Sequence, residues 1–303
     1  LLERLSDNKK MPMFTSCCPG WVSYLTMNHP EMLLNLSTTK SPQQIFGALV
    51  KTYFAKKTGV APENICSISI MPCVSKKREA ALDSMKASGY QDVDYVLTTR
   101  EMVRLLRAEH IDPRGLQEMP FDSPIGDGTG AGALFGVTGG VMEAALRTAY
   151  KVVTGEEAPE DAFQKVRDTR SEGRDNAINL GGIRTADFDI AGRTLKTCVV
   201  SGLKNAERVI KQIKRGEAHY DFVEVMACPG GCVGGGGQPI HEGCEWAPQR
   251  GQRLYNLDKK RKLRRSHENP QVQQLYKDFL EKPLSEKAEK LLHTQHVWEK
   301  NYR

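Results

Sequence analysis

Three short loops rich in cysteine, glycine and proline constrain this sequence more than any other feature. They read Thr-Ser-Cys-Cys-Pro-Gly-Trp (15–21), Met-Pro-Cys-Val-Ser-Lys-Lys (71–77) and Ala-Cys-Pro-Gly-Gly-Cys (227–232). No single loop has enough cysteines to hold a metal centre, and the two C-x2-C pairs of a zinc ribbon are missing. Four thiolates from three loops can instead close around an iron–sulfur cube, which needs one thiolate for each iron. The sequence therefore predicts a cluster site built by the tertiary fold from Cys18, Cys73, Cys228 and Cys232.

The length and charge of the chain narrow the possible classes of protein. Its 303 residues are enough for a large core and two lobes. The net charge of +6 is modest, and the densest basic run, 259–265, has no interleaved aromatic residues. This run favours a solvated or partner-facing surface over nucleic-acid binding. No apolar stretch approaches the length of a membrane span, and no signal peptide is visible. Because the chain opens Leu-Leu-Glu-Arg-Leu without an initiator Met, we expect an incomplete N-terminus.

The cysteines favour reduced thiols over a disulfide framework. All eight are gathered in motifs or apolar runs, not spread at framework spacings. Cys66 and Cys198 lie in strand-like runs, so we expect both to be buried and inert. Cys244 follows a glycine-rich loop, and its role stays open between metal binding and an unrelated thiol.

The pattern of apolar residues predicts an α/β fold. Strand-like runs cover 65–70, 95–98, 197–201 and 222–226, and helical patterns cover 42–57, 99–108, 141–154 and 205–215. Thr99 and Ser201 are the expected helix caps. Such an alternation favours two lobes with parallel-rich sheets flanked by helices, in which the active site lies at the carboxyl ends of the strands, between the lobes. Residues 1–243 would form this core and residues 244–303 a helical C-terminal segment, with helices near 269–280 and 285–293.

Further residues in the loops point to chemistry, each with a structural alternative. Cys17, beside Cys18, is either a reactive spare thiol or a core thiol. Lys76 and Lys77 either balance cluster charge and bind an anionic ligand or form a surface pair. The glycines of 234–237 allow close approach of backbone to a bulky inorganic group. The glycine-rich stretch 126–136 fits a dinucleotide fingerprint only loosely, because no strand precedes it, and a loop over a different cofactor fits better.

With these motifs, the sequence resembles the catalytic domain of the [FeFe]-hydrogenases. The three cysteine loops match the three signatures of that family in order, the third extending over Glu-Val-Met-Ala-Cys-Pro-Gly-Gly-Cys-Val-Gly-Gly-Gly-Gly-Gln-Pro (224–239). Supporting matches are Ser-Pro-Gln-Gln (41–44), Gly-Ala-Gly-Ala-Leu-Phe-Gly (130–136) and Thr-Gly-Gly-Val-Met-Glu-Ala-Ala (138–145). The tail, with Arg-Ser-His-Glu-Asn-Pro (265–270), is similar to the small-subunit segment of the family. The resemblance covers essentially the whole chain.

The resemblance implies a six-iron cofactor, the H-cluster. A [4Fe–4S] cubane would be held by the four cysteines named above. Cys232 would also bridge to a di-iron subsite that carries CO, CN⁻ and an azadithiolate. The residues expected around the di-iron subsite are Lys76, as a donor to a cyanide, and Met71, Met226, Gln43 and Phe135, as residues lining the cavity.

The implied reaction is 2 H⁺ + 2 e⁻ ⇌ H2. Cys17 would be the proton-transfer thiol, Ser37 the serine of the relay and Arg4 an arginine near its outer end, whereas the two glutamates of the relay fall before Leu1. The implied partners are ferredoxin or another electron-carrier protein or subunit, and maturation proteins, with the cytoplasm as the default compartment. Two relatives of different function are the alternatives: hydrogenase-like iron–sulfur assembly proteins, which lack the di-iron subsite, and H2 sensors. Cys17, Lys76 and Met71 favour the enzyme.

Overall fold

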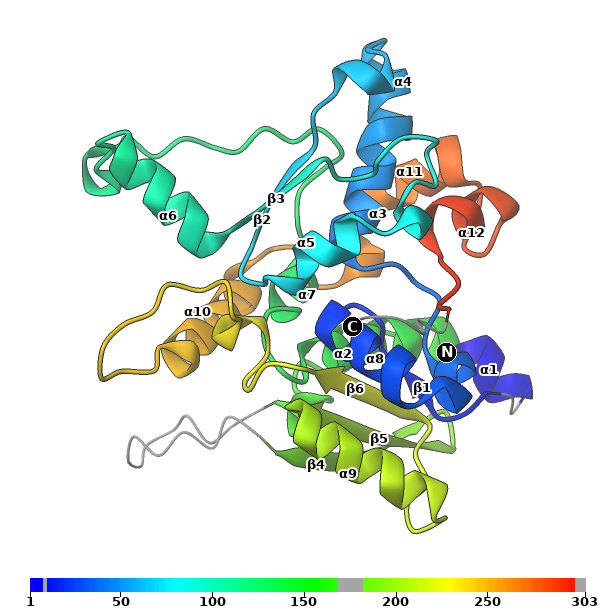
Figure 1. Cartoon of the computed structure of the whole chain (residues 1–303). Coiled ribbons are helices and arrows are strands. Elements are labelled where there is room, and N and C mark those ends of the chain that lie inside the picture. The colour runs from blue at the N-terminus through cyan, green and yellow to red at the C-terminus, as the bar shows by residue number, and fades with distance from the viewer. Residues whose placement is uncertain (8–9, 168–181, 298–303) are drawn as a thin grey trace.

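The computed structural model describes residues 1–7, 10–167 and 182–297, which form an α/β fold with two sheets (Figure 1). The strands are β1 (Met13–Phe14), β2 (Ile68–Met71), β3 (Tyr95–Thr98), β4 (Ile183–Ile190), β5 (Arg193–Ser201) and β6 (Phe222–Met226). The α-helices are α1 (Leu2–Asp7), α2 (Pro19–Asn28), α3 (Pro42–Leu49), α4 (Ala55–Thr58), α5 (Ser75–Ala80), α6 (Thr99–Ala108), α7 (Gly130–Leu134), α8 (Gly140–Thr154), α9 (Leu203–Lys214), α10 (Ala247–Lys260), α11 (Pro270–Leu275) and α12 (Glu286–Leu292). The predicted fold class is confirmed.

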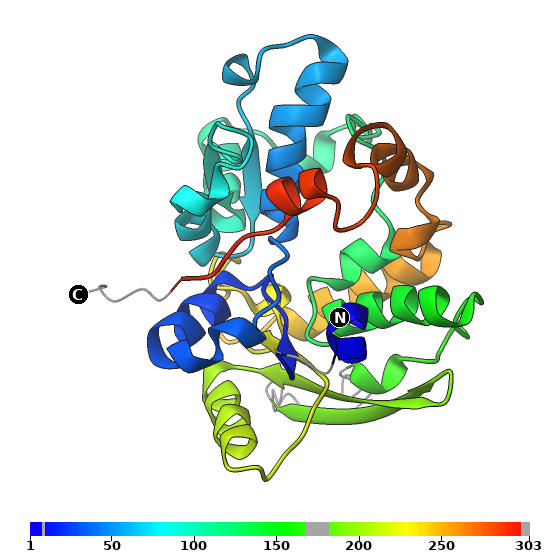
Figure 2. The same ribbon diagram turned by 90° about the vertical axis from the view of Figure 1, so that its right-hand side faces the viewer.

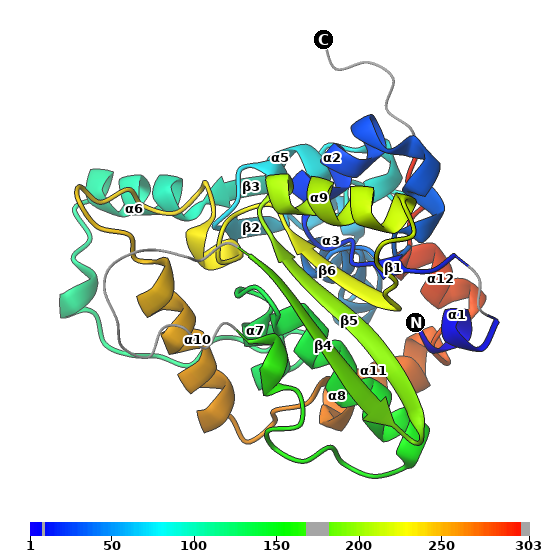
Figure 3. The same ribbon diagram turned by 90° about the horizontal axis from the view of Figure 1, so that it is seen from below.

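The larger sheet has the strand order β1-β6-β5-β4. β6 pairs in parallel with both β1 and β5, and β4 runs antiparallel to β5. All five residues of β6 are buried, as expected for a central parallel strand covered on both faces. Phe222 packs with side chains of α8, whereas Val223 and Val225 pack with α2 and α9, because alternate residues of a strand face opposite sides. Figure 3 shows α8 and α9 on opposite faces of this sheet.

The smaller sheet pairs β2 with β3 in parallel. Val96 of β3 packs with Ala80 and Val93 on one face. On the other, Ile68, Ile70 and Tyr95 are 58%, 51% and 63% exposed. Figure 1 shows the two sheets in the lower and upper halves of the molecule, with α2, α5 and α7 between them. The carboxyl ends of β2 and β6 therefore lead into the space between the sheets.

The C-terminal segment contacts both halves of the molecule. A Cβ atom on Gly130 of α7 would lie 2.3 Å from the Asp258 carboxylate of α10, so the glycines of the stretch 126–136 allow close helix packing there. Leu49 of α3 packs in one apolar cluster with residues of α11 and α12. Beyond α12 the Thr294 amide donates to the Thr38 carbonyl at 2.7 Å. Figure 2 shows this last stretch, in red, running between the two halves.

A buried charged network fixes α10 to α8. Arg147 of α8 donates to both carboxylate oxygens of Asp258 at 2.9 Å and to Glu143 at 2.6 Å. Arg167 adds two bonds to Glu143, and Arg264 adds one to Asp258. Glu143 is 1% exposed and Asp258 is fully buried. Each buried carboxylate therefore has two arginine partners, which is the arrangement that offsets the cost of removing the charges from water.

We expect Asp258→Asn to lower the free energy of unfolding by about 3 kcal/mol, because it removes one of the two buried negative charges that balance the arginines of the network, leaving Glu143 as the buried counter-charge of Arg147. Urea unfolding followed by circular dichroism measures the loss. Asp278→Asn is the control, since this carboxylate lies on the exposed side of the tail. A loss under about 1 kcal/mol, in the ordinary range of surface substitutions, would show that the network does not hold the two helices together.

Several local predictions differ from the structure. The cap of α6 is Thr98, not Thr99: its hydroxyl accepts the Glu101 amide, and the Glu101 carboxylate accepts the Thr98 amide in return. The cap of α9 is Gly202, with a φ of 88°, and not Ser201. Cys198 is buried as predicted, whereas the prediction for Cys66 is wrong, because this residue is exposed just before the open edge of β2.

Candidate metal-cluster site

The three cysteine loops each follow the carboxyl end of a strand. Cys18 comes four residues after β1 and is the N-cap of α2. Cys73 lies between β2 and α5, and Cys228 follows β6. Cys232 begins a short 3-10 turn (Cys232–Gly234). Parallel strands present their carboxyl ends at one edge of a sheet, where binding sites form in α/β folds. The chain thus brings cysteines from both sheets to one place.

The four thiols lie close enough to influence one another. Burial raises the pKa of Cys18 and Cys228, and raises that of Cys232 to about 12. Repulsion between neighbouring thiolates raises these pKa values further, and it acts between all six pairs of the four cysteines. Four half-buried thiols this close together are therefore costly to ionise at once unless a cation compensates their charge, and iron in a cluster supplies that compensation.

The spacing of the quartet is too wide for a single ion. Within the described ranges, Glu157, His267 and Glu268 are the one group whose three ligand atoms all lie within 4.8 Å of one another. Sulfurs around one zinc ion would be about 3.8 Å apart, because tetrahedral Zn–S bonds are about 2.3 Å long. A cube with a separate iron for each thiolate needs a wider spacing. The donor set and its geometry fit an iron–sulfur cluster better than zinc.

Backbone amides point at two of the sulfurs. The Ala227 amide donates to the Cys18 sulfur at 3.4 Å, and the nearby Trp21 amide also lowers the pKa of this thiol. The Gly236 amide acts on the pKa of the Cys228 thiol in the same direction. These bonds oppose the effect of burial and lower the pKa of the two thiols. Hydrogen bonds to cluster sulfurs also set the reduction potential of iron–sulfur centres.

The glycines of the third loop let the three loops pack on one another. A Cβ atom on Gly235 would lie 2.0 Å from the Pro72 carbonyl oxygen, and one on Gly237 would lie 2.7 Å from the Cys73 amide. Gly231, with a φ of 94°, would meet the Thr138 amide at 2.7 Å. Gly236 faces open space. The glycines were predicted to admit an inorganic group, and at these three positions they admit neighbouring backbone.

Two partners, the Cys17 carbonyl and the Glu79 carboxylate, hold the side chain of Lys76 near the cysteines. Its ammonium donates to the Cys17 carbonyl at 3.1 Å and to the Glu79 carboxylate at 2.9 Å. Glu79 also accepts bonds from Ser41 and Gln43. The ammonium also contacts the second Glu79 oxygen at 3.2 Å, so its three donors are engaged and an anionic ligand would take the place of one of the bonds to Glu79. Sequence reasoning missed Glu79, although its position three residues after Lys76 on α5 was an available signal.

Cys17 lies beside this lysine and the quartet. The residue is half-buried. Burial, with the nearby charges of Cys18 and Glu224, raises the pKa of the Cys17 thiol well above its usual range, and Lys76 opposes the rise. The thiol therefore carries its proton at neutral pH. A protonated thiol next to a cationic side chain can donate a proton toward the site and take one back.

The other predicted cofactor residues surround the same region. Met71 and Met226 are the last residues of β2 and β6, so each leads directly into a cysteine loop. Met226 is 2% exposed, and Met71 packs in part against the core of the smaller sheet. Gln43 bonds through its amide oxygen to Ser69 and through its nitrogen to the Lys76 carbonyl. Phe135 ends α7 and is half-buried.

Arg4 lies next to the segment that carries Ser37 and contacts this segment through backbone carbonyls. Arg4 donates to the carbonyls of Asn35, at 3.2 Å, and Leu36, at 2.8 Å, immediately before Ser37. The Ser37 hydroxyl accepts the Thr39 amide at 3.2 Å, and the Ser37 carbonyl bonds to the His296 ring at 2.9 Å. Arg4 thus supports the segment that carries Ser37.

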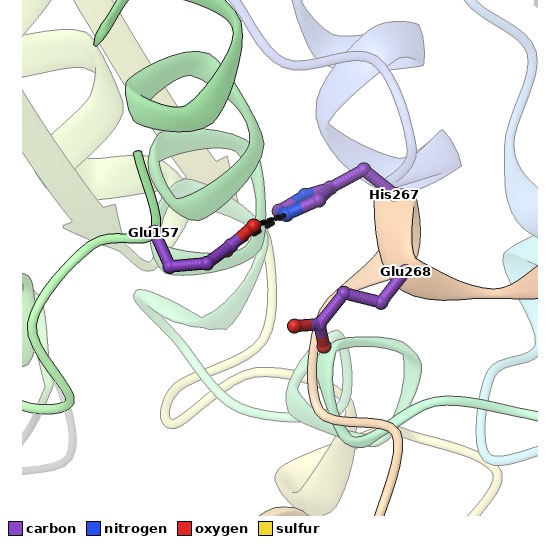
Figure 4. Close-up of side chains that lie close together, drawn as sticks. All are labelled: Glu157, His267 and Glu268. Atoms are coloured by element: carbon purple, nitrogen blue, oxygen red, sulfur yellow. Dashed lines mark hydrogen bonds and ion pairs between the residues drawn. The ribbon is translucent and has the colours of Figure 1, made fainter. Parts of the chain in front are cut away.

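Glu157, His267 and Glu268 form a second group of potential ligands, which Figure 4 shows in close-up. Cations already neutralise its carboxylates. Arg265 pairs with Glu268 at 2.7 Å and with Glu157 at 3.3 Å, and Lys151 pairs with Glu157 at 3.1 Å. The group is therefore a cluster of ion pairs that connects the segment after α8 to the C-terminal segment.

Comparisons with known proteins agree with this architecture. The sequence matches the family "Iron only hydrogenase large subunit, C-terminal domain" over residues 1–236 and "Iron hydrogenase small subunit" over residues 245–298. It is 46% identical over 290 residues to the NADP-reducing hydrogenase subunit HndD of Solidesulfovibrio fructosivorans, covering 95% of this chain and 48% of that protein. The apo [FeFe]-hydrogenase HydA1 variant C377H from Chlamydomonas reinhardtii has a similar structure, with a TM-score of 0.82 and 39% identity over 99% of this chain and 80% of that one. The chain belongs to the iron-only hydrogenase family, and it spans about half the length of the bacterial relative.

The relatives differ in the function and the compartment that their names give. One is a cytosolic Fe–S cluster assembly factor of Danio rerio, 33% identical over 97% of this chain and 70% of its own length. Another is the periplasmic [Fe] hydrogenase large subunit of Nitratidesulfovibrio vulgaris, 44% identical over 86% of this chain and 60% of its own length. Within the part of the chain that the structure describes, no helix has the length and apolar character needed to cross a membrane.

Proposed function

We propose that this chain is the catalytic domain of an [FeFe]-hydrogenase, which binds the H-cluster and catalyses 2 H⁺ + 2 e⁻ ⇌ H2. The observation that carries the proposal is the convergence of four half-buried thiols with Cys17 and an anchored Lys76. Residues 1–243 form the catalytic core and residues 244–303 the small-subunit-like segment. The partners are ferredoxin or a similar electron carrier, and maturation proteins that deliver the di-iron subsite in the cytoplasm.

Each residue of the site has a distinct role in this proposal. Cys18, Cys73, Cys228 and Cys232 would hold the cubane, and Cys232 would also be the residue that attaches the di-iron subsite. Lys76 would turn one of its donors from Glu79 to a cyanide, a charge-assisted bond, while its other bonds to Glu79 and to the Cys17 carbonyl orient it. The residues that shape the cavity around the di-iron ligands are Met71, Met226, Gln43 and Phe135. When bound, the H-cluster supplies the electron storage and the open iron position at which H2 is formed or split.

The chain itself moves the proton. Burial keeps the Cys17 thiol protonated, so it can hand its proton toward the cavity and be reprotonated from the side of the protein. Ser37, supported by Arg4, belongs to the outer part of this relay. The Cys17 carbonyl bonds to Lys76, which fixes the backbone of the relay thiol relative to the cyanide donor. The same lysine thus orients the cofactor and the proton-transfer residue.

The main competing function is cluster assembly, which the similarity to an assembly factor favours. An assembly protein needs thiols for a cubane but has no use for a relay thiol beside an anchored ammonium. Cys17 and Lys76 therefore favour the enzyme, and they also favour it over an H2 sensor without high turnover.

Infrared spectroscopy tests the proposal. After anaerobic reconstitution with iron and sulfide and loading of the di-iron subsite, we expect bands from bound CO and CN⁻ together with hydrogen evolution from a reduced carrier. A four-iron cluster without these bands would favour assembly. Bands without substantial turnover would favour a sensor, and failure to bind any four-iron cluster would refute both the enzyme and the assembly function.

A further inference from the structure

Glu224 is a fully buried carboxylate in β6, four residues before Cys228. One carboxylate oxygen accepts the Gly139 amide and the other accepts the Met142 amide, each at 2.6 Å. These two amides belong to the cap and the first turn of α8. Glu224 thus bonds β6, the strand that leads into the third cysteine loop, to the start of α8.

The helix needs this partner. The first amides of a helix have no acceptor within the helix, and the N-cap of α8 is a glycine without a side chain that could accept them. Glu224 supplies acceptors for two of these amides from another element, and a negative charge there also interacts favourably with the helix dipole. Burial raises the pKa of Glu224 to about 7, while the amide bonds oppose the rise.

The turn that Glu224 holds, residues 136–142, is also the surface on which the third cysteine loop rests. The Thr138 amide donates to the Gly230 carbonyl at 3.1 Å, and the Val233 amide donates to the Gly136 carbonyl at 2.9 Å. Gly231 approaches the Thr138 amide so closely that a Cβ atom would not fit. β6 leads into the cysteine loop, the loop bonds to the turn, and the Glu224 bonds connect the turn back to β6.

We infer that Glu224 is a positioning residue for Cys228 and Cys232: by clamping the turn 136–142 to β6, it fixes the surface that holds the loop 228–233 in shape. The inference rests on the proposed function, because the loop shape matters for holding the cluster. A plain helix cap would stabilise α8 alone. A positioning residue also controls the order of the loop and the retention of the metal.

Hydrogen exchange of the apo chain separates these two roles. Glu224→Gln keeps the size of the side chain, but its amide nitrogen faces a backbone N–H where an acceptor is needed. We expect at least about a tenfold faster exchange both at 136–142 and at 228–234. Ser285→Ala is the matched control, because it removes the cap of α12, where the Ser285 hydroxyl accepts the Ala288 amide. It should leave both segments unchanged. Faster exchange confined to 136–142 would overturn the inference.

Cluster retention gives a second readout on reconstituted protein. We expect Glu224→Gln to release iron to a chelator at least about tenfold faster than wild type and to alter the electron paramagnetic resonance signal of the reduced cluster, with Ser285→Ala matching wild type. Wild-type release and an unchanged signal in Glu224→Gln would overturn the role. Should that variant fail to fold, Glu224→Asp keeps the charge with a shorter reach and is judged by the same two measurements. A wild-type chain that binds no cluster would refute the proposed function, while the exchange experiment would still decide the clamp.

Discussion

Cys232→Ala, carried through the same anaerobic loading as the wild type, is expected to show no infrared bands from CO or CN⁻ and no hydrogen evolution. The physical reason is that Cys232 is proposed as the only covalent tie between the protein and the di-iron subsite. The rest of that subsite would be held by shape and by weaker bonds, such as the one from Lys76. Loss of the bridging sulfur therefore removes both a cubane ligand and the attachment point.

The matched control is Cys244→Ala, which removes an exposed thiol outside the quartet. Its iron content, infrared bands and turnover should equal those of the wild type. Bands that persist unchanged in Cys232→Ala would contradict the bridging role. If the bands disappear in both variants, the loss reflects general thiol damage during loading and not the role of Cys232.

The sequence predicts the strands that are rich in β-branched and apolar residues and misses a very short strand and an edge strand. The runs 95–98 and 222–226 coincide with β3 and β6, because such residues dominate both runs as they do in parallel strands, although Glu224 lies inside β6 and Tyr95 of β3 is exposed. β1 has two residues, too few for any pattern. β4 alternates apolar with charged side chains and pairs on one side only, as the antiparallel edge of its sheet. The place of β4 at the edge of the sheet depends on its pairing with β5, and a continuous apolar run does not mark such a strand.

The cysteine site was predictable for a different reason. Cysteine, proline and glycine at short spacing indicate metal chemistry from the local sequence alone, whereas the partners of Glu224 cannot be read from neighbouring residues. Glu224 bonds to amides more than 80 positions earlier in the chain, and a single acidic residue inside an apolar strand carries no sign of them. Likewise Ser201, expected as a helix cap, accepts the Gly230 amide of the third cysteine loop instead. Residues that support the site from behind become visible only when the loops are folded together.

Cys17→Ala is expected to retain the complete cofactor and to lose turnover by a factor of about 10² to 10⁴, the usual contribution of a positioned proton donor. Alanine removes the sulfur proton and leaves the Cys17 carbonyl, so the bond from Lys76 and the infrared bands should persist. Unchanged bands with greatly reduced hydrogen evolution would separate proton transfer from cofactor binding. Cys66→Ala, at an exposed position near β2, is the control and should keep full turnover.

Cys17→Ser sharpens the test. A hydroxyl can donate a hydrogen bond, but it gives up its proton far less readily than a thiol, so the serine variant should be nearly as slow as the alanine variant. Full turnover in fully loaded Cys17→Ala would show that protons reach the cavity by another route. Recovery by serine alone would show that a hydrogen bond at this position, and not transfer of the thiol proton, supports catalysis. The surroundings of the thiol favour transfer, because it is near enough to Cys18, Cys232 and Lys76 for their charges to act on its pKa, and its own carbonyl accepts a bond from the Lys76 ammonium.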